Sequence, residues 1–341
     1  MILNVKKALS QNYTSDHYSG FSVVIAAKNE AANIPRLISA LSNIDYPESF
    51  FEVIIVDDNS EDNTCQLTED LIKDFQNFSI IRAEDKNLPG KKGALEAGLS
   101  KAKHDFIMIT DADCVPSSGW LKAFNNYLPQ QPGILFGIAP LFQKKNLVNH
   151  ISCFENLRSS LLTLSLTKAG LPYTAAARNF GFSRKVFNNI GGYKQTLQTL
   201  GGDDDLLIRQ GVIHNVKIIP VTEQNSEVFS ESKASFKEYF VQKSRHLKTS
   251  AYYLLKQKLA LGYWHLLNLF FIFSPVLVLI NTWFISFFII KIIYDEIVVL
   301  LYQKRFGYSF SVFRIFYLQI LYEVLLVVNF ILSRIRKDRW K

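Results

Sequence analysis

Two aspartates, Asp111 and Asp113, follow an apolar run at residues 106–109. Successive side chains of a strand point to opposite faces, so carboxylates at positions i and i+2 at a strand end point the same way. Such a pair repels itself unless a cation lies between the two charges, and Mg²⁺ or Mn²⁺ with oxygen ligands fits there. Aspartate is also common in solvated turns. The pair alone is therefore weak support for a metal site. The choice between a metal site and a solvated turn depends on the surrounding elements.

Strands and helices are expected to alternate around this pair. Short apolar runs predict buried strands at residues 21–27, 51–56, 79–82 and 106–109, and helical spacing of apolar residues predicts helices at 31–43, 64–77 and 90–102. This alternation predicts an α/β fold with a parallel sheet, in which ligands bind beyond the carboxyl ends of the strands. The polar residues at those ends are Lys28, Glu30, Asp57, Asp58, Asp111 and Asp113. Three independent runs that deliver polar side chains to one edge favour a binding site there.

Composition limits the classes of function. The 341 residues carry a net charge of +8, and 48% of them are hydrophobic, with the apolar excess toward the C-terminal end. The sequence has no zinc-finger spacing and no basic stripe interleaved with aromatics, so we expect no nucleic-acid partner. Cys65, Cys114 and Cys153 form neither a disulfide framework nor a metal spacing, which indicates a reducing, cytosolic side. Residues 1–20 are polar, lack a signal peptide and are expected to be poorly ordered.

Several stretches together resemble the inverting glycosyltransferases of family 2. In the first half they are VVIAAKNEAANI, FEVIIVDDNSEDNT, GKKGALEAG and DADCVP, and further on ARNFGFSRKVFNNIGGY, GGDDDLLIRQG and QKSRH. The resemblance covers about residues 20–255 and rests on the spacing of several motifs. It implies the GT-A nucleotide-sugar fold with a mostly parallel central sheet. It also implies a hexosyltransferase that takes a nucleotide-diphosphate sugar, such as a UDP-sugar, and uses Mg²⁺ or Mn²⁺.

The resemblance assigns donor-binding roles to the strand-end residues. Asp58 would accept a hydrogen bond from the uracil ring, and Ala27 and Glu30 would contact the nucleoside. Asp113 would be the main metal ligand, while Asp111 would support the metal or contact the ribose. The lysine that opposes the donor phosphates would be Lys91, with the adjacent Lys92 as the alternative.

The acidic run at residues 203–205 would supply the general base, which takes a proton from an acceptor hydroxyl as it attacks the anomeric carbon. Counting back from Arg209 places this base at Asp203. Gly202 replaces the glutamate usual in the family, so Asp204 remains an alternative base. The neighbouring carboxylates should raise the proton affinity of Asp203.

Acceptor-side residues follow from the remaining motifs. Arg178 and Asn179 would line the acceptor side. Gln242, Arg245 and His246 match a segment that closes over the donor diphosphate and the acceptor in the family, with Arg245 on phosphate. His246 stands where the family has tryptophan, which argues against processive polymer synthesis. The acceptor would be a lipid-linked or glycan hydroxyl.

The C-terminal part has the composition of membrane helices. Residues 263–290 and 310–333 are long apolar stretches, and the tail 334–341 is strongly basic. Positive charge on the tail predicts that the tail and the catalytic domain share the cytosolic side of the inner cell membrane, which requires an even number of crossings. Alternatively, residues 263–302 form a hairpin that breaks at Asn281, and the last segment lies at the membrane interface.

The expected organisation is a polar segment at 1–20, a catalytic domain at 21–255, two or three membrane helices within 260–335 and the basic tail. Two other classes of protein fit the sequence less well. A sugar-phosphate nucleotidyltransferase would need a Gly- and Arg-rich phosphate loop, but AAKNEAANI takes that place. A non-catalytic membrane scaffold would not need Asp58, Asp113 and Asp203 at strand and helix ends.

Overall fold

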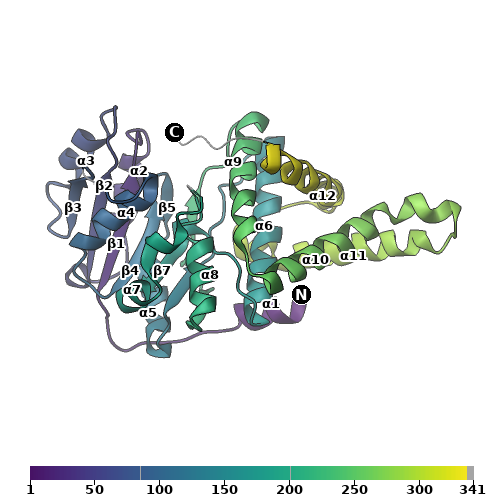
Figure 1. The fold of residues 1–341 in the computed structure, drawn as a ribbon, viewed down its shortest axis with the longest axis horizontal. Coiled ribbons are helices and arrows are strands. Elements are labelled where there is room, and N and C mark those ends of the chain that lie inside the picture. Colours follow the sequence, from purple (N-terminus) through teal and green to yellow (C-terminus); the bar gives the residue numbers. More distant parts are fainter. Residues whose placement is uncertain (85, 200, 336–341) are drawn as a thin grey trace. The chain divides into compact units, whose positions relative to one another are not determined.

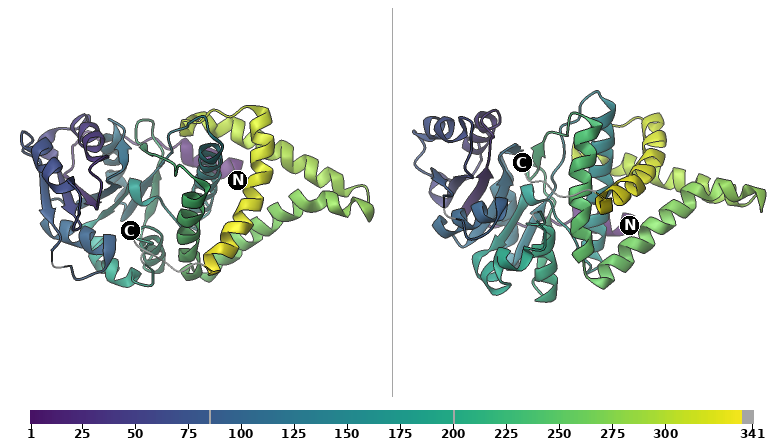
Figure 2. Two further views of the ribbon diagram at one scale, coloured as in Figure 1. Left: turned by 90° about the horizontal axis from the view of Figure 1, so that it is seen from above. Right: turned by 45° about the horizontal axis from the view of Figure 1, so that its top comes forward.

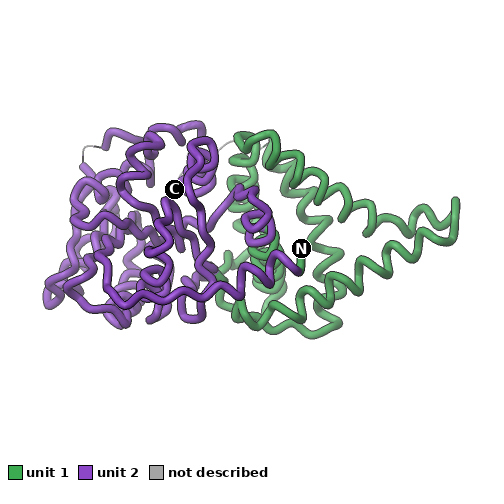
Figure 3. The backbone as a smooth tube through the Cα atoms, turned by 90° about the horizontal axis from the view of Figure 1, so that it is seen from below, with its two compact units in different colours: residues 1–2, 140–162, 232–338 green, residues 3–139, 163–231, 339–341 purple. Residues whose placement is uncertain are grey.

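The computed structural model describes residues 1–84, 86–199 and 201–335, so most of the predicted basic tail lies outside the described residues. The chain divides into two compact units (Figure 3). Unit 2 consists mainly of residues 3–139 and 163–231, and unit 1 of residues 1–2, 140–162 and the chain from 232 onward. The catalytic-domain bounds 21–255 stay a prediction.

A mostly parallel sheet forms the centre of unit 2, as predicted. Within the described residues its order is β3-β2-β1-β4-β7-β6-β8 (Figure 1). The strands β1 to β4 are parallel to one another, whereas β7 runs antiparallel to both β4 and β6. The strands are β1 Phe21–Ala27, β2 Phe51–Asp57, β3 Phe78–Arg82, β4 Phe106–Asp111, β6 Ile134–Gly137, β7 Phe180–Ser183 and β8 Ile218–Val221. Cys114–Pro116 (β5) and Val228–Ser230 (β9) pair separately.

Helices of unit 2 connect these strands. In α2 the apolar residues recur at helical spacing, and all four of Ile34, Leu37, Ile38 and Leu41 are buried. The helices are α2 Ile34–Ser42, α3 Thr64–Ile72, α4 Gly90–Lys101, α5 Trp120–Tyr127, α7 Arg184–Asn189 and α8 Asp205–Ile213. Short 3₁₀ turns are Glu48–Phe50, Leu128–Gln130, Ala177–Asn179 and Gly192–Thr196.

The N-terminal segment is more ordered than the sequence predicted. Residues Ile2–Leu9 form helix α1. Val5 and Ala8 are fully buried, and the Thr222 hydroxyl donates to the Ala8 carbonyl at 2.9 Å. Contacts with residues far along the chain therefore order a segment whose own composition predicts little structure.

The strand register brings the predicted site residues to one edge of the sheet. Ala27 pairs with Asp57, and Ala26 pairs with Asp111 across β1. The carboxyl ends of β2 and β4 therefore finish level with the end of β1, which is the edge where ligands bind in such sheets.

Unit 1 is built from helices. They are residues 147–162 of α6 (Leu147–Lys168), α9 Phe236–Lys248, α10 Leu255–Phe273, α11 Phe284–Tyr302 and α12 Val312–Ile335, with 3₁₀ turns at Thr249–Tyr252, Ser274–Leu279 and Gln303–Phe306. By length and composition alone, two helical stretches among the described residues could cross a membrane, Leu255–Leu279 and Val312–Ile335. Only 17% and 28% of their apolar windows are buried, so neither is an ordinary core helix.

The predicted apolar stretch 263–290 is not one helix. The chain turns after Leu279, and α11 starts at Phe284, so α10 and α11 form a hairpin (Figure 2). Ring contacts of Phe270 with Phe284 and Phe287 join the two arms. Of the two arrangements left open by the sequence, this geometry matches the hairpin that breaks at Asn281.

Charged side chains lie inside unit 1. Arg158 of α6 pairs with Asp295 of α11 at 2.7 Å, and Lys291 pairs with the same carboxylate one helical turn away. All three side chains are buried. A buried carboxylate that neutralises two cations fixes how α6 and α11 meet, because an unpaired charge there would be costly.

We expect Asp295→Ala to lower the free energy of unfolding by about 3–5 kcal/mol, because Arg158 and Lys291 would be left as buried, unpaired cations. Thermal unfolding of the full chain in detergent measures this. A triple variant with Arg158→Met, Lys291→Met and Asp295→Leu removes all three charges and should keep most of the stability. A single variant as stable as wild type would contradict the role given to this ion pair.

Candidate functional site

A lysine bridges two carboxylates at the carboxyl edge of the sheet. The Nζ atom of Lys91 lies 2.7 Å from Oδ1 of Asp111 and 2.6 Å from Oδ2 of Asp203. Asp111 ends β4, Lys91 is the second residue of α4, and Asp203 precedes α8. Gly90 starts α4 with a φ of 61°, a left-handed conformation that glycine adopts without strain. Three segments far apart in the sequence thus meet at one ammonium group.

The charges at this bridge are strongly coupled. Burial disfavours the charged form of Lys91, but Asp111 and Asp203 outweigh it and raise the pKa of Lys91 well above its usual value. Burial would also raise the pKa of Asp203, yet Lys91 lowers it below the usual aspartate value. The prediction that neighbouring carboxylates raise the proton affinity of Asp203 was therefore wrong, because the lysine contact dominates.

Asp204 has a different environment. Its side chain caps α8 and accepts hydrogen bonds from the backbone N–H of Asp205 and of Ala177, both at 2.7 Å. Burial, Asp205 and Asp203 raise the pKa of Asp204 well above its usual value. Both oxygens of Asp204 hold backbone in place, whereas Asp203 faces Lys91. Of the two alternative bases, the geometry favours Asp203.

A group suited to a divalent cation lies beside the bridge. Ligand atoms of Asp111, Asp113 and Cys114 lie within 4.8 Å of one another. The Cys114 thiol donates to Oδ1 of Asp113 at 3.4 Å, and burial raises its pKa well above the usual value, so it is a neutral thiol. Arg36 holds the turn by donating to the Asp113 carbonyl at 3.2 Å. Two carboxylates with an inert thiol fit an oxygen-preferring ion such as Mg²⁺ or Mn²⁺.

The ends of β1 and β2 form the adjoining part of the edge. The backbone N–H of Asp58 donates to the Ala27 carbonyl at 2.7 Å, and both side chains are buried. The Asp58 carboxylate pairs with Lys86, which the sequence analysis did not single out. Lys86 lies in the β3–α4 loop, where no motif marks it. Glu30 accepts a hydrogen bond from the Asn33 amide at 2.6 Å, at the start of α2.

The two adjacent lysines, Lys91 and Lys92, make different contacts. Lys92 is buried and donates to the carbonyls of Thr196 and Thr199, the latter at 3.0 Å. Burial lowers the pKa of Lys92 to about 8. Lys92 thus anchors the segment before Asp203, and Lys91 alone of the two faces the carboxylates.

Asn179 lies in the core rather than on the acceptor side. It is fully buried, and its Oδ1 accepts from the Trp120 indole at 2.9 Å. Its Nδ2 donates to the carbonyls of Ile138 and Ser226 at 2.8 and 2.9 Å. These bonds occupy its amide, so we withdraw the predicted acceptor contact. Arg178 is only half-buried and donates to the Ala139 carbonyl.

The remaining predicted residues belong to unit 1. Gln242, Arg245 and His246 lie on α9, which starts with a capping box between Ser235 and Glu238. Their predicted roles at the donor and acceptor stay predictions.

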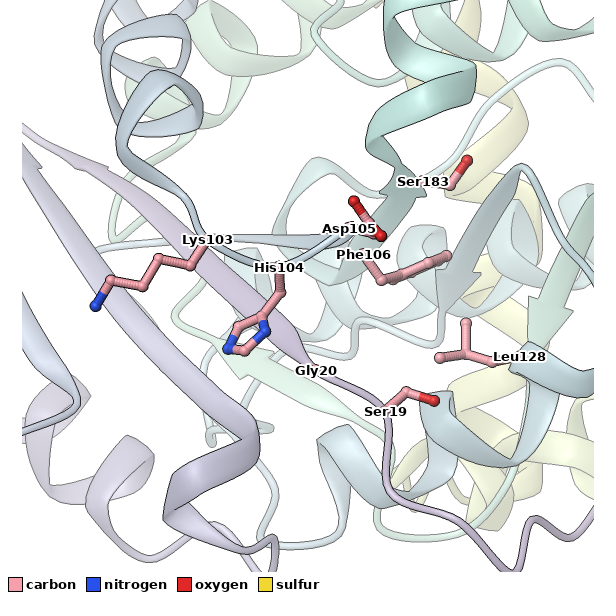
Figure 4. A pocket seen from close by; sticks show the side chains of 8 residues that line it. All are labelled: Ser19, Gly20, Lys103, His104, Asp105, Phe106, Leu128 and Ser183. Carbon is pink, nitrogen blue, oxygen red and sulfur yellow. The ribbon is translucent and has the colours of Figure 1, made fainter.

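A pocket of about 390 Å³ lies at the opposite end of the sheet (Figure 4). It is lined where β1 and β4 begin, by Ser19, Gly20, Lys103, His104, Asp105, Phe106, Leu128 and Ser183. None of the predicted site residues lines it. The candidate site is therefore the carboxyl edge and not this pocket.

We expect Asn179→Ala to lower the free energy of unfolding by about 3 kcal/mol, because the Trp120 N–H and two carbonyls lose their partner. Chemical denaturation of the full chain measures the loss. Arg178→Gln, at the adjacent half-buried position, should cost less than about 1 kcal/mol. An Asn179→Ala variant with unchanged stability but impaired turnover would restore the acceptor role.

Comparisons with known proteins agree with this geometry. Residues 22–191 match the family described as "Glycosyl transferase family 2". A beta-monoglucosyldiacylglycerol synthase of Trichormus variabilis is 33% identical over 124 residues, covering 36% of this chain and 24% of that protein. A probable glycosyltransferase, YdaM, of Bacillus subtilis is 24% identical over 245 residues, covering 69% and 56%. The matches therefore span between about a quarter and about half of these relatives' length.

One solved structure is similar over nearly the whole chain. It is the mannosyltransferase PcManGT from Pyrobaculum calidifontis, in complex with GDP-Man and Mn²⁺. The TM-score is 0.60 at 16% identity, and the match covers 96% of this chain and 93% of that one. This likeness confirms the predicted GT-A fold. The matched family and its relatives confirm the resemblance seen in the motifs, and the chain belongs to glycosyltransferase family 2.

Proposed function

We propose that the chain is an inverting glycosyltransferase that moves a sugar from a UDP-sugar or a related nucleotide-diphosphate sugar to an acceptor hydroxyl. The observation that carries the proposal is the Lys91 bridge between Asp111 and Asp203. It brings together one cation that could bind phosphate, one carboxylate that could support a metal ion and one candidate base. Relatives named as a glycolipid synthase and as a poly-beta-1,6-N-acetyl-D-glucosamine synthase of Staphylococcus epidermidis belong to the same class of enzyme.

The donor would lie along the carboxyl edge of the sheet. Asp58, Ala27 and Glu30 would contact the nucleoside. The ammonium group of Lys91 would turn from the carboxylates to the diphosphate and bind it. Asp113, supported by Asp111, would hold Mg²⁺ or Mn²⁺. When bound, such an ion stabilises the negative charge of a leaving diphosphate.

Asp203 would act as the general base. Its lowered pKa keeps it ionised at neutral pH, so it can accept a proton. When the donor diphosphate draws Lys91 away, the Asp203 carboxylate is freed to take the proton of the acceptor hydroxyl. A single displacement then forms the new glycosidic bond with inversion, and no covalent enzyme intermediate is needed.

The acceptor is proposed to be a lipid-linked or glycan hydroxyl at a membrane. The exposed apolar helices of unit 1 would insert into the inner cell membrane, with the catalytic domain and the basic tail on the cytosolic side. Arg178 would line the acceptor side, and Gln242, Arg245 and His246 on α9 would close over donor and acceptor.

We expect Asp203→Asn to reduce turnover about 10²–10⁴-fold, because the amide cannot accept the proton. UDP affinity should stay near the wild-type value. Release of UDP from a panel of UDP-sugars with membrane lipids as acceptors measures turnover, and calorimetry measures UDP binding.

Asp204→Asn is the matched control, because it also replaces a carboxylate with an amide, at the neighbouring position. It should lower stability more than turnover, because Asp204 caps α8. If Asp204→Asn loses turnover and Asp203→Asn does not, the base is Asp204. If both variants stay active, the inverting mechanism has been given the wrong residues.

We expect Lys91→Met to bind Mn²⁺ about tenfold more tightly without nucleotide, because the ammonium no longer competes for Asp111. Asp113→Ala should abolish the binding. Titration of the full chain with Mn²⁺, followed by electron paramagnetic resonance, measures both. Lys92→Met removes the same charge one residue away and should bind Mn²⁺ much as wild type does. Unchanged affinity in Asp113→Ala would place the ion elsewhere.

A further inference from the structure

One face of the α10–α11 hairpin presents apolar side chains to its surroundings. Along α10 they recur every three or four residues and form a continuous stripe. At the turn between the arms Leu279 is 97% exposed and Trp283 is 76% exposed. The stripe comprises Leu255, Leu259, Tyr263, Leu266, Phe270 and Phe273.

The charged residues at the two ends of this hairpin are basic. Residues 259–290 contain no Asp, Glu, Lys or Arg. Lys256 and Lys258 are exposed in the first turn of α10, and exposed Lys304 follows the end of α11, beside the half-buried Arg305. We call these four residues the hairpin feet.

Acidic side chains do not balance the feet. Residues 249–335 contain three of them in the sequence, Asp295, Glu296 and Glu323. Asp295 and Glu323 are buried, and Glu296 is half-buried. The exposed charge of this segment is therefore positive.

The dimensions fit a bilayer. At 1.5 Å per residue, the uncharged arm from residue 259 to 279 is about 30 Å long, which is the thickness of the hydrocarbon core. With the turn inserted first, both feet emerge on the same side, at the level of the lipid headgroups. There the cations meet phosphate groups, and each such contact strengthens attraction to an anionic surface.

We propose that the hairpin feet bind the phosphate headgroups of anionic lipids, so that this chain selects an anionic leaflet. The inference rests on the membrane insertion proposed above and adds the lipid class that the insertion prefers. The partner is a bilayer surface rather than a soluble anion, because the cations flank an apolar stripe of membrane length.

Native mass spectrometry of the full chain in detergent tests this, with equimolar phosphatidylglycerol and phosphatidylcholine of identical acyl chains. Wild type should retain phosphatidylglycerol several-fold over phosphatidylcholine. In the double variant Lys256→Gln/Lys258→Gln, which removes two of the four cations of the feet, most of this several-fold preference should be lost. The control Lys73→Gln/Lys101→Gln removes the same charge from exposed lysines of unit 2 and should keep the wild-type preference.

Equal retention of the two lipids by wild type, or an unchanged preference in the Lys256→Gln/Lys258→Gln variant, would overturn the proposal. Carbonate washing of proteoliposomes separates this outcome from failure of the membrane proposal. A chain that resists carbonate but shows no lipid preference overturns only the headgroup contact. A chain that carbonate releases from both lipids overturns the insertion and the headgroup contact together.

Discussion

The ammonium group of Lys91, held between Asp111 and Asp203, is the interaction on which the rest of the site depends. Two carboxylates brought together in a half-buried place need a cation, and an unpaired charge there would be costly. The parallel sheet delivers Asp111, and α4 delivers Lys91. Lys92 ties down the segment before Asp203, so that the third partner reaches the same point.

This arrangement gives the free protein a cation of its own at the place where we propose that metal and diphosphate meet. The same lysine that keeps the carboxylates together is the one whose charge a diphosphate would attract. In the mechanism that we propose, one side chain thus couples binding of the donor to release of the base. The neighbouring Asp204 stays out of this exchange because its oxygens hold the backbone of residues 177 and 205.

The sequence predicted the first four strands and their polar ends because a buried parallel strand is a continuous apolar run, visible without knowledge of its neighbours. It could not predict the partner of Asp203, which lies 112 residues away at Lys91. Burial raises the pKa of Asp203, but the contact with Lys91 outweighs burial and lowers this pKa below its usual value. The core position of Asn179 was hidden for the same reason, since its partners come from α5 and from two distant loops. Helix α1 likewise depends on packing rather than on local pattern, whereas the break of the hairpin near Asn281 was one of the two arrangements that the sequence left open.

Unit 1 reverses the usual distribution of side chains, with charges such as Arg158 and Asp295 inside and apolar residues outside. In water this arrangement would expose a large apolar surface. In a bilayer the apolar surface would contact lipid, and the charged side chains would stay inside the unit. This distribution supports the membrane insertion that we propose for unit 1.

The most direct test of the account is an experimental structure of the full chain with UDP and Mn²⁺ bound. We expect Mn²⁺ to bind at Asp113, Lys91 to turn to the diphosphate, and the Asp203 carboxylate to be free to face an acceptor. A structure in which UDP and Mn²⁺ bind away from Asp113, while Lys91 still bridges Asp111 and Asp203, would contradict it.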